Sequence, residues 1–377
     1  MLDLKRQYEP LHAELLEAVD HVLKTQQFIL GEPAAHFEQS AASALGVSHA
    51  IGCSSGTDAL WLALAAAGIG PGAAVVTTPF SFFASVSAIL RAGVTARLAD
   101  IDPVTFNLDA QKVEAVLDAP GGAAVQAVLP VHLYGQTADW TEFGKLGRAR
   151  GVKLIEDAAQ AWGAQWQGKP AGGLGDAAAF SFYPTKNLSA AGDAGMVSTN
   201  SDEVAERARM LRQHGMRRRY YHDEIGWNTR LDGFQAAVLS VKLKYIARWN
   251  EARRACAARY DALFRAAGLA ETGPYPERGV VLPVEVEGAH HVRHQYVIRT
   301  ARRDALRAFL SERKIGSEIY YPVPLHLQDA LKPLGYKAGD FPEAERAANE
   351  VLALPMFAEL REDEQETVVG AIAEFLS

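Results

Sequence analysis

The chain has 377 residues, 49% of them hydrophobic and 22% charged, and a formal net charge of −7 at pH 7. That length suits one large domain with a smaller one, and the acidic balance argues against a general nucleic-acid binder. The two cysteines, Cys53 and Cys256, lie too far apart in sequence for a disulfide framework or a metal cluster. The N-terminus lacks a signal-peptide core, and no uncharged apolar run nears the roughly 18 residues of a membrane span. We therefore expect a cytoplasmic protein with free thiols.

The N-terminal part of the chain is predicted to be an α/β unit. Apolar residues at helical spacing predict a helix over residues 8–25, and a second helix is expected over about 34–45, after the break at FILGEP. Short apolar runs that indicate buried strands follow at 49–53, 74–78, 94–98, 127–131, 152–155 and 177–182. Helical stretches separate most of them, at 58–67, 81–92, 109–117 and 140–150. This alternation predicts a largely parallel sheet covered on both faces.

The pattern changes near residue 250. Helices are predicted at 201–213 and 231–249, and the second is long enough to lead into a new unit. Beyond it, strand-like runs at 280–285, 295–299 and 319–321 mix with helices at 303–313 and 363–375. We therefore divide the chain into a large domain, 1–249, and a small C-terminal α+β domain, 250–377.

The turn after the first predicted strand has the composition of a phosphate seat. Ligands of open parallel sheets bind beyond the carboxyl ends of the strands. The turn from Ser54 to Thr57 joins a strand to a helix, so backbone N–H groups and hydroxyls gather at a helix N-terminus. Taken alone, ordinary helix capping is the favoured interpretation of this turn.

An acid and a lysine follow two later strands. Asp157 ends the strand at 152–155, where it could cap, pair with an arginine, or hold a buried cation. Lys186 follows the strand at 177–182, between aromatic and small residues that would partly desolvate its amine and lower its pKa. A lysine is most often a surface residue. Together with the turn, however, this pair suits pyridoxal phosphate, which needs a lysine Schiff base and an acid against its pyridine nitrogen.

A set of segments spread over nearly the whole chain strengthens that interpretation. They are CSSGTDAL, TTPFSFFAS, LPVHLYGQ, IEDAAQAWGA, FSFYPTKNLSAAGDAG, NTRLDGFQAAVL, HQYVIR and YYPVPLH. In their residues and in their order along the chain, these segments resemble those of the DegT-type (DegT/DnrJ/EryC/StrS) nucleotide-sugar aminotransferases. The resemblance implies a fold-type-I, aspartate-aminotransferase-like α/β protein with a mostly parallel central sheet. It also implies a pyridoxal 5′-phosphate cofactor and a homodimer with a composite active site.

The resemblance assigns a role to each residue around the cofactor. Lys186 would form the Schiff base and then carry the proton between cofactor and substrate, while Asp157 would hold the pyridine nitrogen's proton. The other implied cofactor contacts are Gly56, Thr57 and Ser181 to the phosphate, Phe82 stacked on the ring, Gln160 near the 3′-oxygen, and Asn228 reaching the phosphate across the dimer interface. Phe82 could equally be a core aromatic.

The implied reaction moves an amino group from L-glutamate to a nucleoside-diphosphate-linked keto sugar. Tyr183 and the sequence around Lys186 resemble the matching segment of family members that aminate a 3-keto sugar. The alternative substrates are a 4-keto sugar and a 3-keto-uronate. Arg230, Tyr320 and Tyr321 fall where relatives that handle 3-keto-uronates contact substrate. Those relatives carry a histidine in place of the first tyrosine, which argues against a uronate.

Several features are left open or set aside. His326 either borders the substrate or shapes its loop, and the run Arg217–Arg219 either is solvated or meets a nucleotide diphosphate. Ser189 stands where a glycine is common in the family, which leaves the shape of that loop open. The histidines at 290, 291 and 294 lack metal-ligand spacing, so no metal is predicted.

A rival of another class is a regulatory protein that keeps the fold without catalysis. Loss of Lys186 or Asp157 would favour it, and both residues are present. The lysine also separates the chain from the family's dehydratase branch, in which a histidine replaces it.

Overall fold

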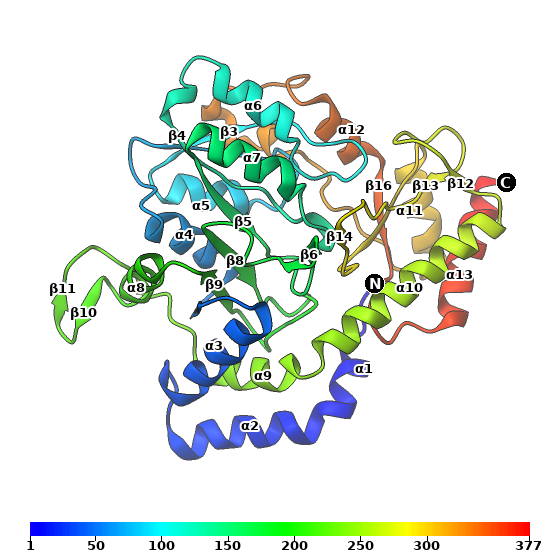
Figure 1. Ribbon diagram of the computed structural model, residues 1–377. Helices are drawn as coiled ribbons and strands as arrows, with labels where there is room; N and C mark the ends of the chain where they lie inside the picture. The colour runs from blue at the N-terminus through cyan, green and yellow to red at the C-terminus, as the bar shows by residue number, and fades with distance from the viewer.

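A seven-stranded sheet lies at the centre of the larger part of the molecule, in the order β1-β9-β8-β5-β4-β2-β3 (Figure 1). The computed structural model describes the chain from Met1 to Ser377, apart from the side chain of Ala123. The strands are β1 (His49–Cys53), β2 (Ala74–Thr77), β3 (Thr95–Leu98), β4 (Val125–Val128), β5 (Lys153–Asp157), β8 (Ala177–Ser181) and β9 (Gly195–Thr199). β9 runs antiparallel to β1 and β8, and the other neighbouring pairs are parallel. The predicted α/β class with a mostly parallel sheet is confirmed.

Helices cover both faces of this sheet, because its strands are apolar on both sides. In β8, Ala177 and Ala179 face one core, while Ala178 and Phe180 face the other. The first core also contains residues of α4 (Gly56–Ala66), α5 (Ala84–Arg91) and α8 (Asp202–Leu211). The second contains residues of α2 (His12–Thr25), α3 (Gly31–Leu45) and α9 (Gly233–Leu243). A further cluster under α6 (Ala110–Asp118) and α7 (Trp140–Arg150) completes the cover.

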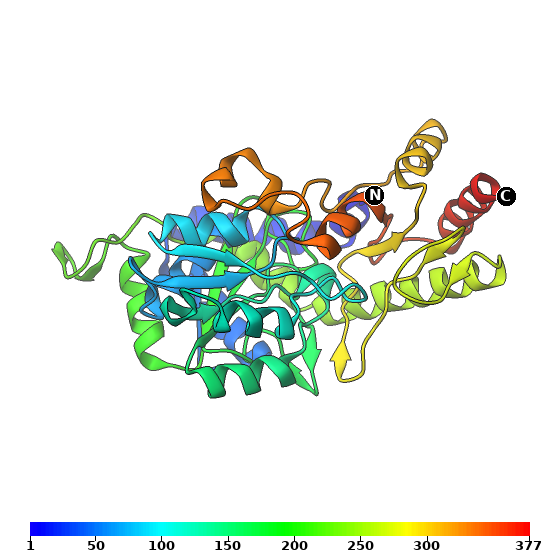
Figure 2. The ribbon, with the colours of Figure 1, turned by 90° about the horizontal axis from the view of Figure 1, so that it is seen from above.

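A long helix, α10 (Ile246–Ala266), leads from the large sheet to a second, four-stranded sheet (Figures 1 and 2). The strands of this sheet are β12 (Ala270–Glu271), β13 (Val280–Val281), β15 (Tyr296–Arg299) and β16 (Val351–Leu354), accompanied by α11 (Arg303–Glu312), α12 (Pro342–Glu350) and α13 (Glu362–Leu376). A three-stranded ribbon of β6 (Gln165–Trp166), β7 (Lys169–Pro170) and β14 (Ala289–His290) joins the two parts. Among the described helices, none is both long enough and apolar enough to cross a membrane.

The C-terminal part packs back onto the large sheet. The backbone N–H of Leu325 donates to the carbonyl of Pro79 at 2.7 Å, and the N–H of Leu98 donates to the Tyr336 hydroxyl at 3.1 Å. The N-terminal segment also contacts the C-terminal part, since Arg6 forms a salt bridge with Glu364 of α13 at 2.7 Å. The predicted boundary between residues 249 and 250 falls inside α10, so the two parts share a continuous helix.

Several predicted elements differ from the structure. The helix expected over 231–249 is two helices, α9 and α10, which meet at Lys244 and Tyr245. No glycine or proline marks that break, so the sequence pattern runs through it. α3 begins at Gly31 rather than at 34, because Pro33 lies in the first helical turn, where its missing N–H costs no hydrogen bond. The run at 319–321 forms no strand, and only Glu318 beside it bridges to Ala353.

A short hairpin projects from the body of the molecule (Figures 1 and 2). It consists of β10 (Met216–Arg218) and β11 (Tyr221–His222). Arg217 pairs with Glu206 and Asp223, while the Arg218 guanidinium lies 3.8 Å from the centre of the Tyr221 ring. The basic run is therefore at the surface, and its contact with a nucleotide diphosphate stays a prediction.

Candidate active site

The turn between β1 and α4 both caps the helix and leaves backbone donors free. The Ser55 hydroxyl accepts the Asp58 N–H at 3.1 Å, and the Asp58 carboxylate accepts the Ser54 hydroxyl at 2.5 Å. These side chains are therefore engaged in capping. The N–H groups of Gly56 and Thr57 lie in the first turn of α4, where a helix has no acceptor for them. An anion placed at this end of α4 would receive both.

Two glycines let this turn lie close to the end of β8. Ser181 is opposite Gly195 of β9, which is in turn opposite Cys53 of β1. A Cβ built on Gly195 would lie 2.2 Å from the Ser55 carbonyl oxygen, and one on Gly56 would lie 2.5 Å from the Ser181 Cβ. Only glycine permits these approaches. The Ser181 side chain thereby lies directly against Gly56.

Asp157 is the last residue of β5 and only 3% exposed. Its carboxylate accepts the Ser85 hydroxyl of α5 at 2.7 Å and the Ala159 N–H at 3.2 Å. Burial raises the pKa of Asp157, and these hydrogen bonds together with the charge of Lys186 oppose the rise. A buried carboxyl in this state favours a positively charged ligand beside it.

Lys186 follows β8, the strand next to β5, and is half-buried. Burial lowers the pKa of Lys186 to about 8, and the Asp157 carboxylate opposes that fall. Among the described residues, no carboxylate lies within ion-pair distance of this amine. A pKa of about 8 leaves roughly a tenth of the amine neutral at pH 7, and this neutral form can act as a nucleophile.

The C-terminal part closes the site through its tyrosine pair. Gln160 accepts the Tyr134 N–H at 2.7 Å and donates to the Tyr321 hydroxyl at 3.1 Å. The Tyr134 hydroxyl donates to the Tyr320 carbonyl. The Phe82 ring lies 6.2 Å from the Tyr321 ring and is 58% exposed, so Phe82 is not a core aromatic. Tyr183, also exposed, lies just before Lys186 in the chain.

The remaining predicted residues lie at the edge of this cluster or outside it. Arg230 bridges to Cys53, the last residue of β1, and the buried Nε of Arg230 has no hydrogen-bond partner in the described part of the chain. Asn228, two residues earlier, is exposed. His326 is buried, with Nε2 3.0 Å from Glu345 and its ring against Phe341. These contacts give His326 a packing role, and a substrate contact for it stays a prediction.

Sequence reasoning missed a buried pair on the opposite face of β5. Glu156 and His132 are both fully buried, 3.0 Å apart. The N–H of Ala138 donates to His132 Nδ1, so the ring proton lies on Nε2 and points at Glu156. The Glu156 carboxylate also accepts the N–H groups of Gly172, Leu174 and Gly175, at 2.7 to 2.9 Å. The adjacent acids in the sequence were a signal, since neighbouring strand residues face opposite sides and only one can reach the site.

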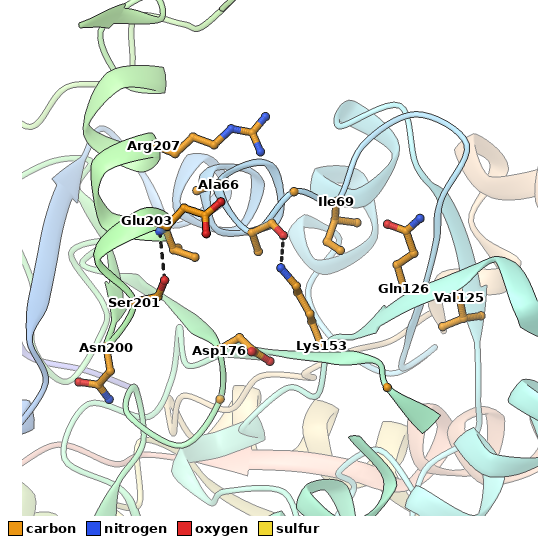
Figure 3. A pocket seen from close by; sticks show the side chains of 15 residues that line it. Ala66, Ile69, Val125, Gln126, Lys153, Asp176, Asn200, Ser201, Glu203 and Arg207 are labelled. Atoms are coloured by element: carbon orange, nitrogen blue, oxygen red, sulfur yellow. Dashed lines mark hydrogen bonds between the residues drawn. The ribbon is translucent and has the colours of Figure 1, made fainter. Parts of the chain in front are cut away.

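A hollow of about 710 Å³ lies at the other end of the sheet (Figure 3). Lys153, the first residue of β5, donates there to the Ala67 carbonyl at 2.6 Å, and Arg207 pairs with Glu224 at 2.7 Å. Lys153 and Arg207 therefore already have partners within the protein. The hollow lies at the opposite end of β5 from Asp157. The described residues also contain no group of three or more His, Cys, Asp or Glu side chains placed to hold a metal.

Comparison with known proteins places these features in one family. A profile of the DegT/DnrJ/EryC1/StrS aminotransferase family matches residues 10–373. A pleiotropic regulatory protein of Geobacillus stearothermophilus is 50% identical over 100% of this chain and 98% of its own. The UDP-N-acetyl-3-dehydro-alpha-D-glucosamine 3-aminotransferase of Acidithiobacillus ferrooxidans is 40% identical over 97% of this chain and 94% of its own. The crystal structure of S. venezuelae DesV in complex with a ketimine intermediate superposes with a TM-score of 0.93, at 40% identity, over 100% of this chain and 97% of that one.

Gly195→Ala tests the close approach under the turn. The added Cβ would meet the Ser55 carbonyl at 2.2 Å and push the turn away from Ser181. Losing one charge-assisted hydrogen bond should weaken binding of pyridoxal phosphate about tenfold, as measured by absorbance titration of the apoprotein. Gly70→Ala, where nothing lies within 4 Å, is the control and should bind normally. Equal affinity of the two variants would contradict this geometry.

Glu156→Ala tests the buried network beneath Asp157. The change leaves the buried His132 and the N–H groups of Gly172, Leu174 and Gly175 without their acceptor, so the free energy of unfolding in urea should fall by about 3 to 5 kcal/mol. Glu114→Ala removes an exposed carboxylate that pairs with Arg150, and should cost under about 1 kcal/mol. A loss no larger than that of the control would show that Glu156 does not hold this network together.

Proposed function

Because the chain belongs to the DegT/DnrJ/EryC1/StrS aminotransferase family, we propose that it moves an amino group from L-glutamate to a nucleoside-diphosphate-linked 3-keto (deoxy)sugar in amino-sugar biosynthesis. Aminotransferases of this family use pyridoxal 5′-phosphate. One observation carries the proposal for this chain. A lysine of lowered pKa follows β8, and a buried acid ends the adjacent strand β5.

The residues present fit the cofactor. Its phosphate matches the free N–H groups of Gly56 and Thr57 above Ser181, and its protonated ring nitrogen matches the buried Asp157 carboxylate. Phe82, exposed beside Tyr321, offers an aromatic face for the ring. When bound, pyridoxal phosphate supplies an electron sink for charge that develops on the substrate carbon.

The chain's own groups then have separate tasks. The Lys186 amine holds the cofactor and, once released, takes a proton from the donor's α-carbon and gives one to the acceptor's former keto carbon. Asp157 stays ionised beside the ring nitrogen because a cation now offsets its burial. Gln160, held by hydrogen bonds to Tyr134 and Tyr321, would place its side-chain amide near the 3′-oxygen of the cofactor ring. The C-terminal part shields the site from water on this side.

Support for the 3-keto position comes from a relative and from the sequence. The Acidithiobacillus ferrooxidans relative, 40% identical, is named for a 3-dehydro sugar nucleotide. Tyr183 is exposed near Lys186, in the segment whose sequence resembles that of family members that aminate 3-keto sugars. A 3-keto-uronate is the second candidate, because the Arg230 guanidinium has a buried nitrogen with no described partner and could receive a carboxylate. A 4-keto sugar is the third.

We also propose a homodimer in the cytoplasm. Asn228 is exposed, as a residue reaching the partner's phosphate site would be, and Phe82 and Tyr183 leave aromatic surface for a ligand or a second chain to cover. Both cysteines are buried and free, in keeping with a reducing compartment.

A regulatory role without catalysis is the rival function. Its support is the 50% identical relative named a pleiotropic regulatory protein. Against it, Lys186 and Asp157 are both present in an arrangement that serves chemistry.

A substrate panel with matched lysine variants tests the proposal. We expect the protein loaded with pyridoxal phosphate to aminate a nucleotide-linked 3-keto sugar with L-glutamate, as followed by mass spectrometry of the products. Lys186→Ala should abolish turnover. Lys242→Ala is the control, because burial also lowers the pKa of Lys242 to about 8, yet this amine lies on α9 and bonds to Ser189.

The outcomes separate the candidates. Amination of a 4-keto sugar or a uronate alone would reassign the substrate. No product from any member of the panel, with the cofactor bound, would favour the regulatory function.

A further inference from the structure

Two buried asparagine side chains meet at one backbone carbonyl beside the candidate site. Asn187 is 2% exposed and Asn250 is 5% exposed. The Nδ2 groups of Asn187 and Asn250 donate to the Trp162 carbonyl oxygen at 2.8 and 2.9 Å, and Asn187 Nδ2 also donates to Asn250 Oδ1 at 3.0 Å. We call Asn187 and Asn250 the asparagine pair, and neither has a task in the proposed reaction.

These hydrogen bonds fix the orientation of both amides. A carbonyl oxygen can only accept, so each asparagine must turn its NH2 group toward Trp162. This leaves Asn250 Oδ1 to accept the second N–H of Asn187. Neither amide can turn over without losing these bonds. The arrangement therefore requires an amide at both positions.

The chain after Trp162 is shaped to admit Asn250. Gly163 has a φ of +87°, a backbone conformation that favours glycine. A Cβ built on Gly163 would lie 2.6 Å from Asn250 Nδ2. The absence of a side chain at this position lets the start of α10 lie directly against the turn that contains Trp162.

The asparagine pair joins the loops that follow the acid and the lysine. Asn187 directly follows Lys186, beyond β8. Trp162 lies in the loop that follows Asp157, beyond β5. On the other side of the lysine, the Lys186 N–H donates to the Tyr183 carbonyl at 2.8 Å. The backbone on both sides of Lys186 is therefore held, and Asn187 ties it to the loop that follows Asp157.

Stability alone is a weak reason for such a pair. A buried pair of hydrogen-bonded groups and an apolar pair of the same shape can be nearly equal in stability. Hydrogen bonds are directional, however, and set a position more narrowly than apolar packing does. Such a position matters where an atom must transfer a proton, since a misplacement of about 1 Å can slow a reaction roughly 100-fold.

We propose that Asn250 is a positioning residue for the reaction, which acts through Asn187 and holds the Lys186 amine within reach of the cofactor and of the substrate carbon. The Asn250 amide is bonded to Asn187 and Trp162, so it acts through the lysine loop rather than on a ligand. The inference rests on the proposed function, in which Lys186 holds the cofactor and moves the proton, and not on the identity of the sugar.

Capture of pyridoxal phosphate by the apoprotein tests the position of Lys186 without turnover. The rate is followed by borohydride trapping and quantitation of the Lys186 peptide by mass spectrometry. Asn250→Ala frees the Asn187 side chain, so Lys186 should capture the cofactor about tenfold more slowly than in the wild type. Asn187→Ala should slow capture at least as much. The double variant should be no slower than Asn187→Ala, because Asn250 acts through Asn187.

The glutamate half-reaction of the loaded protein separates positioning from general damage to the site. In Asn250→Ala its rate at saturating glutamate should fall about tenfold, while the half-saturating glutamate concentration should stay as in the wild type. Gln365→Ala is the matched control, because Gln365 of α13 is also a buried amide, whose Nε2 donates to the Cys256 carbonyl of α10 at 2.7 Å. This variant should lose stability and keep the wild-type rates.

Several results would overturn the inference: wild-type rates in Asn250→Ala, a change only in its half-saturating glutamate concentration, an equal slowing in Gln365→Ala, or a double variant slower than Asn187→Ala. If Asn250→Ala does not fold, Asn187→Ala decides, and a wild-type capture rate in that variant would overturn the inference as well. Wild-type protein that captures no pyridoxal phosphate would overturn the proposed function. Equal capture by wild type and Asn250→Ala would overturn only the role of Asn250.

Discussion

The rest of this molecule is organised around two opposite charges at the ends of adjacent strands, a buried carboxylate and a half-buried amine. Asp157 on β5 and Lys186 beyond β8 are each driven by burial toward the neutral form. Neither is satisfied by a direct ion pair in the described part of the chain. A fold that keeps such groups forgoes stability at this point. A ligand with a protonated ring nitrogen and an electrophilic carbon complements both groups. The nitrogen would meet the Asp157 carboxylate, and the carbon would meet the Lys186 amine.

The surrounding structure keeps these two groups in place. The fully buried Glu156 is hydrogen-bonded to His132 and to the Gly172 N–H. These bonds hold the opposite face of β5 and so restrict the position of Asp157, the next residue of the strand. The two close-approach glycines, Gly56 and Gly195, let the turn at Ser54–Thr57 pack against Ser181. α10 ties the lysine loop to the segment around His294, and the Tyr320–Tyr321 loop closes the opposite side through Gln160. The site therefore depends on contacts between parts of the chain that are far apart in sequence.

That separation explains how much the sequence could predict. The β/α alternation was enough to predict the sheet, and the rule that ligands bind at strand ends selected Asp157, Lys186 and the turn at Ser54–Thr57 as candidates. For the turn, capping and phosphate binding prove compatible, since side chains do the first and backbone N–H groups are left for the second. The buried pair of His132 and Glu156 could not be found in this way, because the two residues come from different segments of the chain. The break between α9 and α10 was equally hidden, since no residue type marks it.

Protonation of the cofactor's ring nitrogen is the most direct measure of whether Asp157 and the cofactor complete each other. Protein loaded with pyridoxal phosphate labelled with ¹⁵N at the ring would be examined by NMR at neutral pH, beside Asp157→Asn. A protonated nitrogen in the native protein and an unprotonated one in the variant is the expected result. An unprotonated nitrogen in the native protein would contradict the account, because the buried carboxyl would then lack the cation that its environment demands.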